Sequence, residues 1–205
     1  MSFYVGVIDD EQQNINRIKR KARQASFKFV EVPLIEDIEQ MVQEIIGLKV
    51  SALVVDYKLS TTKPHIRYTG VDLVMKLEDY IENYPSFILT AFGDNAEQDL
   101  IDVNKIYDKS EYFNDPSFLN RRINRQVENF NQMIKKAEAE LLDLKRIASP
   151  TLKQQERMIE LDSVIEKHVS KKDALAYSVK TKFYQDRIES LLEKTEKLLE
   201  EVEKL

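Results

Sequence analysis

Apolar and polar residues follow two different patterns along this chain, and the first pattern fills the N-terminal half. Short apolar runs, which predict strands, lie at 3–8, 27–34, 52–55, 87–90 and 105–107. The stretches between them place apolar residues at helical spacing and predict helices at 11–24, 35–47, 70–83 and 95–103. Strands that alternate with helices are typical of parallel β-α-β units, so we expect a doubly wound parallel sheet. Because the strands are almost uninterrupted apolar runs, we expect helices to cover both of its faces.

The second half follows a helical pattern throughout. Apolar residues that are four and three positions apart in turn form a heptad stripe, made of Ile123, Val127, Phe130, Ile134, Ala137, Leu141 and Leu144. A second stripe runs from Ile188 to Leu205, and an amphipathic helix is predicted between the two at 152–169. This pattern predicts an all-α region that is either a helical bundle within one chain or a coiled coil that pairs with a second copy.

Glycine and proline mark the boundary between the two halves. All four glycines and four of the five prolines precede residue 117, and only Pro150 interrupts the sequence beyond it. We therefore predict two domains, an α/β domain at 1–115 and a helical interaction region at 116–205.

Composition narrows the class of protein. The chain has 205 residues, 42% of them hydrophobic, which is enough for a buried core. Acidic and basic residues are interspersed with a formal net charge of −5, which argues against nucleic-acid binding. Cysteine is absent, which excludes disulfides and thiolate metal sites. No long uncharged apolar stretch occurs, so we expect a soluble cytoplasmic protein without membrane contacts.

Polar residues stand at the carboxyl ends of the predicted strands. Asp9 and Asp10 follow the first strand, and Asp56 follows the apolar run 52–55. Thr90 ends the fourth strand, and Lys109 comes shortly after the fifth. Since ligands of parallel α/β sheets bind outside the carboxyl ends of the strands, these side chains are expected to share one rim.

This set of groups has a specific chemistry. Adjacent carboxylates repel one another, and at neutral pH they stay ionised only with a cation between them. Mg²⁺ suits carboxylates together with a backbone carbonyl and a phosphoryl oxygen. A carboxylate beside that ion can act as a nucleophile towards phosphorus, while an ammonium and a hydroxyl stabilise the phosphoryl oxygens.

The order of these residues resembles the receiver domain of response regulators in two-component signalling. The resemblance covers about residues 2–115 and rests on "VIDDE" (7–11), "LVVDYKL" (53–59), "TGVDLVMKL" (69–77), "PSFILTAFGD" (85–94) and "IYDKS" (106–110). It implies a flavodoxin-like, doubly wound sheet of five parallel strands, followed here by the helical region.

The resemblance also implies a role for each residue at the rim. Asp56 would be the phosphoacceptor, Thr90 the switch hydroxyl and Lys109 the lysine that binds the phosphoryl group. The groups implied as Mg²⁺ ligands are Asp9, Asp10, Asp56 and the backbone carbonyl of Lys58. The phosphoryl donor would be a sensor histidine kinase or a phosphotransfer protein, and the chain itself would not be an enzyme.

Three features depart from the receiver pattern. Ser110 stands where receivers have proline, which leaves the peptide bond after Lys109 as either cis or trans. Ile106 occupies the position of the usual switch aromatic, with Tyr107 next to it, so the coupling of the threonine to an aromatic is expected to be weak or rerouted. The segment 59–69 is longer than usual, and its basic residues are either inert or contact the phosphoryl group or its donor.

The helical region carries no catalytic motif of its own. Residues 117–205 contain no glycine, which disfavours a compact DNA-binding module, and no phosphate-binding loop. His168 is predicted as a surface helix residue, with a phosphotransfer histidine as the alternative. Two hypotheses follow. The first is a phosphorylation-switched regulator that signals through contacts of helices 116–205, either with a protein target or with a second copy in a homodimer. The second is a scaffolding coiled-coil protein with a receiver-like domain that does not signal.

Overall fold

The N-terminal half forms one parallel sheet. The computed structural model describes residues 3–21, 25–92, 99 and 102–170. The strands are β1 (Phe3–Ile8), β2 (Phe27–Glu31), β3 (Ala52–Val55), β4 (Ser86–Thr90) and β5 (Ile106–Asp108). All four pairings are parallel, and the order across the sheet is β2-β1-β3-β4-β5. This is the flavodoxin-like order, so the predicted fold is confirmed.

The helices agree with the pattern of the sequence, with one addition. They are α1 (Gln12–Lys21), α2 (Ile38–Gly47), α3 (Gly70–Tyr80), α5 (Lys109–Asn114), α6 (Ser117–Lys145) and α7 (Leu152–Ser170), with a 3₁₀ turn η2 (Val103–Lys105). The short helix α5 was not predicted. Most of the predicted helix 95–103, and the heptad stripe from Ile188 to Leu205, lie outside the described residues.

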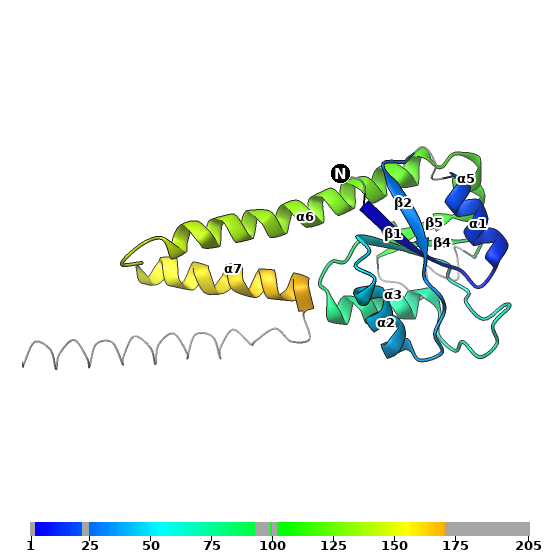
Figure 1. Cartoon of the computed structure of the whole chain (residues 1–205), viewed down its shortest axis with the longest axis horizontal. Helices are drawn as coiled ribbons and strands as arrows, with labels where there is room; N and C mark the ends of the chain where they lie inside the picture. The colour runs from blue at the N-terminus through cyan, green and yellow to red at the C-terminus, as the bar shows by residue number, and fades with distance from the viewer. Residues whose placement is uncertain (1–2, 22–24, 93–98, 100–101, 171–205) are drawn as a thin grey trace, which may run out of the picture. The chain divides into compact units, whose positions relative to one another are not determined.

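Helices cover both faces of the sheet, as the apolar strands predicted. Along β3, Leu53 and Val55 face one apolar core, whereas Ala52 and Val54 face the other. The first core is completed by α2 and α3, and the second by α1, α5 and the beginning of α6. Figure 1 shows α2 and α3 together on one side of the sheet and α1 and α5 on the other. A strand buried on both sides has no room for polar side chains until it ends, so polar groups gather at the rim.

Capping side chains fix where the helices around the sheet begin. Asp37 caps α2 by accepting a hydrogen bond from the backbone N–H of Gln40 at 2.8 Å. Thr69 caps α3 in a capping box with Asp72, in which each side chain accepts from the other residue's backbone N–H. This capping box sets the start of α3 directly behind the loop that leaves β3.

One apolar stripe of α6 serves two cores. The chain divides into two compact units between Met133 and Ile134, inside this helix. Before the division, Ile123 and Val127 are buried in the core of the sheet. After it, Ala137 and Leu141 pack against α7 in a separate small core. The boundary predicted at residues 115 and 116 marks the start of α6, whereas the compact units separate further along it.

The two-helix core beyond Met133 is small. Its buried members are Ala137, Leu141 and Leu161, with Leu144, Met158 and Ile165 partly buried around them. Arg157 of α7 also forms an exposed two-pronged ion pair with Glu140 of α6. Among the described helices, none has both the length and the apolar composition needed to cross a membrane.

Candidate phosphoacceptor and metal site

The five residues singled out at the strand ends come together at one rim of the sheet. Asp9 and Asp10 follow β1 directly, and Asp56 follows the neighbouring strand β3. Thr90 is the last residue of β4, and Lys109 follows β5 as the first residue of α5. All five are buried, with exposed fractions between 0% and 8%. Because the strands are adjacent and parallel, their ends deliver these side chains to the same place.

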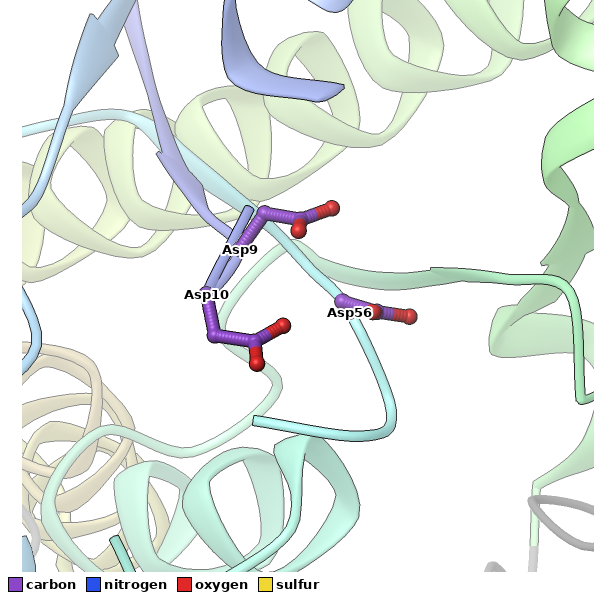
Figure 2. Close-up of side chains that lie close together, drawn as sticks. All are labelled: Asp9, Asp10 and Asp56. Carbon is purple, nitrogen blue, oxygen red and sulfur yellow. The ribbon is translucent and has the colours of Figure 1, made fainter. Parts of the chain in front are cut away.

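Three carboxylates form the centre of the site. Asp9, Asp10 and Asp56 each offer an oxygen, and these oxygens lie within 4.8 Å of one another. Figure 2 shows the two neighbouring acids from the end of β1 beside Asp56 from the end of β3, with their side chains pointing the same way. The backbone N–H of Asp56 donates to the carbonyl of Ile8 at 2.9 Å, which holds the two strand ends in register.

The carboxylates of the β1 end are held by different partners. Asp9 accepts hydrogen bonds at Oδ1 from the backbone N–H of Glu11 at 2.9 Å and from the Asn14 amide at 3.2 Å. Asp10 accepts at Oδ2 from the backbone N–H of Thr62, a residue of the long segment between β3 and α3. The orientation of each acid is therefore fixed by residues that surround the site.

Lys109 joins two of the carboxylates. Its Nζ lies 2.8 Å from Asp9 Oδ2 and 2.8 Å from Asp56 Oδ2. Burial on its own lowers the pKa of Lys109, but the charges of Asp56 and Asp9 outweigh it, so the pKa is raised and the ammonium stays charged. This lysine supplies the cationic group that the sequence placed at the fifth strand end.

The backbone around Lys109 is set by a helix cap. Asp108 accepts at Oδ1 from the backbone N–H groups of Ser110 and Glu111 and thereby caps α5. The described residues contain no cis peptide bond, so the Lys109–Ser110 bond is trans. The chain turns from β5 straight into a helix, and Lys109 reaches the site from its first position.

The pKa of Asp56 reflects two opposing effects. Burial raises the pKa above the usual range of aspartic acid, and the charge and hydrogen bond of Lys109 oppose the rise. The neighbouring Thr90 hydroxyl also lowers it slightly. Thr90 Oγ1 accepts a hydrogen bond from the backbone N–H of Phe92 at 3.1 Å, which leaves its own proton available to donate at the rim.

The site fits a divalent cation. Three carboxylates and one ammonium leave two negative charges in excess within a buried cluster. Oδ1 of Asp56 is buried and makes no hydrogen bond at bonding distance to any described residue. A hard cation that prefers oxygen ligands, such as Mg²⁺, would balance the excess negative charge and coordinate this oxygen. Asp9, Asp10 and Asp56 are the side chains that would hold it, and the carbonyl of Lys58 stays a prediction.

Gly70 allows the loop after Asp56 to close tightly. A β-carbon at position 70 would lie 2.1 Å from the Asp56 carbonyl oxygen, well inside van der Waals contact. The backbone N–H of Gly70 donates to the carbonyl of Tyr57 at 2.8 Å. The first residue of α3 therefore lies against the backbone of the candidate phosphoacceptor, which only glycine permits.

Lys58 and Phe92 stand at the solvent side of the site. They are two residues beyond Asp56 and Thr90, and the Lys58 ammonium lies 5.2 Å from the centre of the Phe92 ring. This cation–π pair holds the two bulky side chains together, and we expect them to hinder the access of water to a phosphoryl group on Asp56.

We expect a phosphoryl group on Asp56 to be lost slowly, and a Phe92→Ala variant to lose it several-fold faster because water gains access. Release of phosphate from protein labelled with acetyl phosphate measures both rates. A Phe118→Ala variant is the control, because Phe118 is exposed to a similar degree, 53% against 48%, and lies on α6. Equal rates in all three proteins would contradict this assignment.

Ile106 and Tyr107 stand at and next to the position of the usual switch aromatic, and they pack on different sides of the sheet. Ile106 packs against one core and Tyr107 against the other, where Tyr107 contacts Phe87 with ring centroids 5.9 Å apart. The predicted weak coupling of Thr90 to an aromatic stays a prediction.

The prediction that His168 is a surface residue is wrong. This histidine is only 7% exposed, and its Nδ1 lies 2.7 Å from the carbonyl oxygen of Val164. It comes seven positions after Leu161 and so shares the face of α7 that packs against α6. A buried ring of this kind offers no accessible nitrogen for phosphotransfer.

Two features of the site were not predicted from the sequence, namely the hydrogen bond from Thr62 to Asp10 and the cap of α5. Nothing in the composition of a loop indicates that its threonine will bond to an acid far away in the sequence. The cap had a signal, because Asp108 is followed three residues later by Glu111, the spacing of a helix start.

Comparisons with known proteins found similar solved structures but no matching family model. No family model matches the chain, and no curated protein matches it either. One similar solved structure is the BeF₃-activated receiver domain of DrrB, with 15% identity and a TM-score of 0.45 over 62% of this chain and 99% of that one. Another is the anti-anti-sigma factor PhyR from Bartonella quintana, with 15% identity and a TM-score of 0.46 over 67% of this chain and 52% of that one.

The strand order and the residues at the rim define the class of the fold. It is a response-regulator-like receiver fold followed by a helical region, as the sequence predicted.

Proposed function

We propose that this protein is a phosphorylation-dependent response regulator that accepts a phosphoryl group on Asp56 with Mg²⁺ bound. The observation that carries the proposal is the cluster of three buried carboxylates, with Lys109 bridging Asp9 and Asp56 at 2.8 Å each. A purely structural ion pair needs one acid for one base, whereas this site gathers three acids around one lysine and leaves an oxygen of Asp56 without a hydrogen bond.

The chemical step follows from the groups at the rim. An oxygen of the Asp56 carboxylate attacks the phosphorus of a phosphohistidine, a new P–O bond forms, and the P–N bond breaks as the histidine leaves. The Lys109 ammonium then lies beside the phosphoryl oxygens, and the Thr90 hydroxyl donates a hydrogen bond to one of them. A bound Mg²⁺ would neutralise the charge that phosphoryl oxygens and carboxylates bring together.

The partners follow from the same reasoning. The donor is a sensor histidine kinase or a phosphotransfer protein, and the protein passes the signal on in the cytoplasm by contact rather than by acting as an enzyme. The region 116–205 carries that contact, with a protein target or with a second copy, and without nucleic acid. Support comes from α6, whose Ile123 and Val127 belong to the core of the sheet, so that a change at the rim reaches the helix through packing.

Acetyl phosphate with Mg²⁺ tests the proposal directly. We expect a mass increase of one phosphoryl group on intact protein, located to Asp56 in peptides, and no label in an Asp56→Asn variant. Asp99→Asn is the matched control, because this acid lies outside the cluster, where it accepts a hydrogen bond from Tyr57. Measuring the mass in solution with and without beryllofluoride then reports whether the modification changes self-association.

The opposite results would support a receiver-like domain that does not signal. If acetyl phosphate and beryllofluoride both leave Asp56 unmodified in the presence of Mg²⁺, the phosphoacceptor role is wrong. The scaffolding alternative, a helical protein with an inactive receiver-like domain, would then remain.

A further inference from the structure

The segment 59–69 is fixed at both ends by buried side chains. We call it the rim loop, since it connects β3 to α3 beside the site. Leu59 and Ile66 are each 1% exposed and belong to the core that α2 and α3 cover. Tyr68 donates from its hydroxyl to the carbonyl of Ile35, which fastens the end of the loop to the segment before α2. Anchors at both ends give the residues between them a defined position.

Between these anchors, Thr62 bonds to Asp10 in two ways. Its backbone N–H donates to Asp10 Oδ2, and its hydroxyl donates to the backbone carbonyl of Asp10. The two residues are 52 positions apart in the sequence, so the contact is tertiary and specific. It holds the main chain and the side chain of the same acid at once.

The basic residues of the rim loop do not make its contact with the acidic cluster. Lys63 acts electrostatically on Glu31 at the end of β2, where it lowers the pKa of that carboxyl together with the larger effect of Lys19. Among the described residues, the ion pairs of the acidic cluster come from Lys109 and not from Lys63 or Arg67. The contact of the loop with the acidic cluster is therefore made by Thr62.

We infer that Thr62 is a positioning residue for the metal-binding carboxylate of Asp10, so that the rim loop sets the affinity for Mg²⁺. The inference rests on the proposed function, because it assigns a role at the same cation site. A carboxylate whose Oδ2 is held by an N–H group presents Oδ1 in a fixed direction. Partners that orient a metal ligand in this way typically change metal affinity 10- to 100-fold when they are removed.

Binding is reciprocal, which gives the inference a second consequence. If a closed rim loop favours Mg²⁺, Mg²⁺ must favour the closed loop by the same free energy. The amide of Thr62 donates to Asp10 in the closed loop, so Mg²⁺ slows its hydrogen exchange.

The test is a Mg²⁺ titration by calorimetry with the full chain and matched variants. Thr62→Val keeps the size of the side chain but removes the hydroxyl that ties the rim loop to the carbonyl of Asp10, so that the N–H is no longer held against Asp10 Oδ2. We expect about tenfold weaker Mg²⁺ binding, the lower end of the range for such partners. Thr62→Ser keeps the hydroxyl and is expected to bind like the parent. Thr61→Val is the control, since both threonines are exposed and Thr61 is the immediate neighbour.

The outcomes separate this inference from the proposed function. The metal site stands if the parent binds Mg²⁺ and the Asp10→Asn variant does not bind it. If Thr62→Val then binds Mg²⁺ as tightly as the parent or tighter, the role of Thr62 is wrong. Absence of Mg²⁺ binding by the parent overturns both. Weaker binding by Thr62→Val, restored in Thr62→Ser and accompanied in the parent by slower exchange at Thr62 with Mg²⁺, supports the inference. If Thr62→Val binds Mg²⁺ more weakly only because the variant is less folded, as a lower melting temperature without Mg²⁺ would show, the result counts against the inference.

Discussion

A Lys109→Met variant is expected to lose about 3 kcal/mol of unfolding free energy in the absence of divalent cations, because removing one partner of a buried ion pair leaves the other charge uncompensated. The lysine is 8% exposed and bridges two carboxylates that are themselves 3% and 7% exposed. Methionine keeps a similar length of apolar side chain, so the loss reports on the charge. Urea unfolding of the parent and the variant in EDTA measures the difference.

Mg²⁺ is expected to restore much of this loss. A ligand that binds only the folded state stabilises it by about 2.7 kcal/mol at a hundred times its dissociation constant. The variant has three carboxylates and no competing ammonium, so it should gain more from Mg²⁺ than the parent does. Lys135→Met, a change at an exposed position of α6, is the control and should alter stability little. If Mg²⁺ stabilises the parent and Lys109→Met equally, the lysine and the cation do not share the same carboxylates.

The loss in the Lys109→Met variant also depends on pH. Burial raises the pKa of Asp56, and Lys109 opposes this rise, so its removal raises the pKa further. Above the ordinary aspartate value of 3.8, the folded variant then binds a proton that the unfolded chain has released. Stability falls with rising pH wherever the folded state binds more protons. The deficit should therefore be larger at neutral pH than in mild acid.

A Gly70→Ala variant is expected to be destabilised by roughly 1 to 3 kcal/mol, the usual cost of forcing extra volume into a packed site. The added β-carbon would lie 2.1 Å from the carbonyl oxygen of Asp56, which is backbone and cannot rotate away. The loop that carries Asp56 must shift instead, so labelling by acetyl phosphate should also slow. Urea unfolding and the rate of labelling measure the two effects.

Gly47→Ala is the matched control for this prediction. Gly47 is the last residue of α2, and a β-carbon there would meet nothing within 4 Å. Alanine is favoured over glycine in a helix by up to about 1 kcal/mol, so this variant should be as stable as the parent or slightly more stable. Equal behaviour of the two alanine variants would mean that the contact between Gly70 and Asp56 is looser than described.

The sheet and the rim were predictable because both follow from one rule. Four-residue apolar runs such as 52–55 can be buried on both sides only in a sheet covered by helices, and parallel strands then end at a common edge. Asp9, Asp56 and Lys109 could be placed together for this reason, although they are far apart in the sequence. The order of the strands across the sheet does not follow from this rule and was implied only by the resemblance to receiver domains.

Two kinds of contact could not be predicted from the sequence. They are the contacts made by loops and the packing of helix faces in the C-terminal half of the chain. The bond from Thr62 to Asp10 depends on the path of a long loop, and apolar anchors such as Leu59 and Ile66 do not reveal that path in advance. His168 lies on an amphipathic helix whose apolar face the sequence locates only roughly, so a polar residue at its edge was assigned to the wrong side.

The long helix α6 limits how this protein can be taken apart. A fragment that stops at residue 115 would lack Leu119, Ile123 and Val127, and would expose to water the part of the sheet core that α6 covers. Fragments that end near Met133 keep this cover. For the same reason, a chimera that gives the α/β domain a different helical region should be joined beyond Met133, in phase with the heptad that continues towards Ala137. The point at which the sequence changes its composition is therefore not the point at which the molecule can be cut.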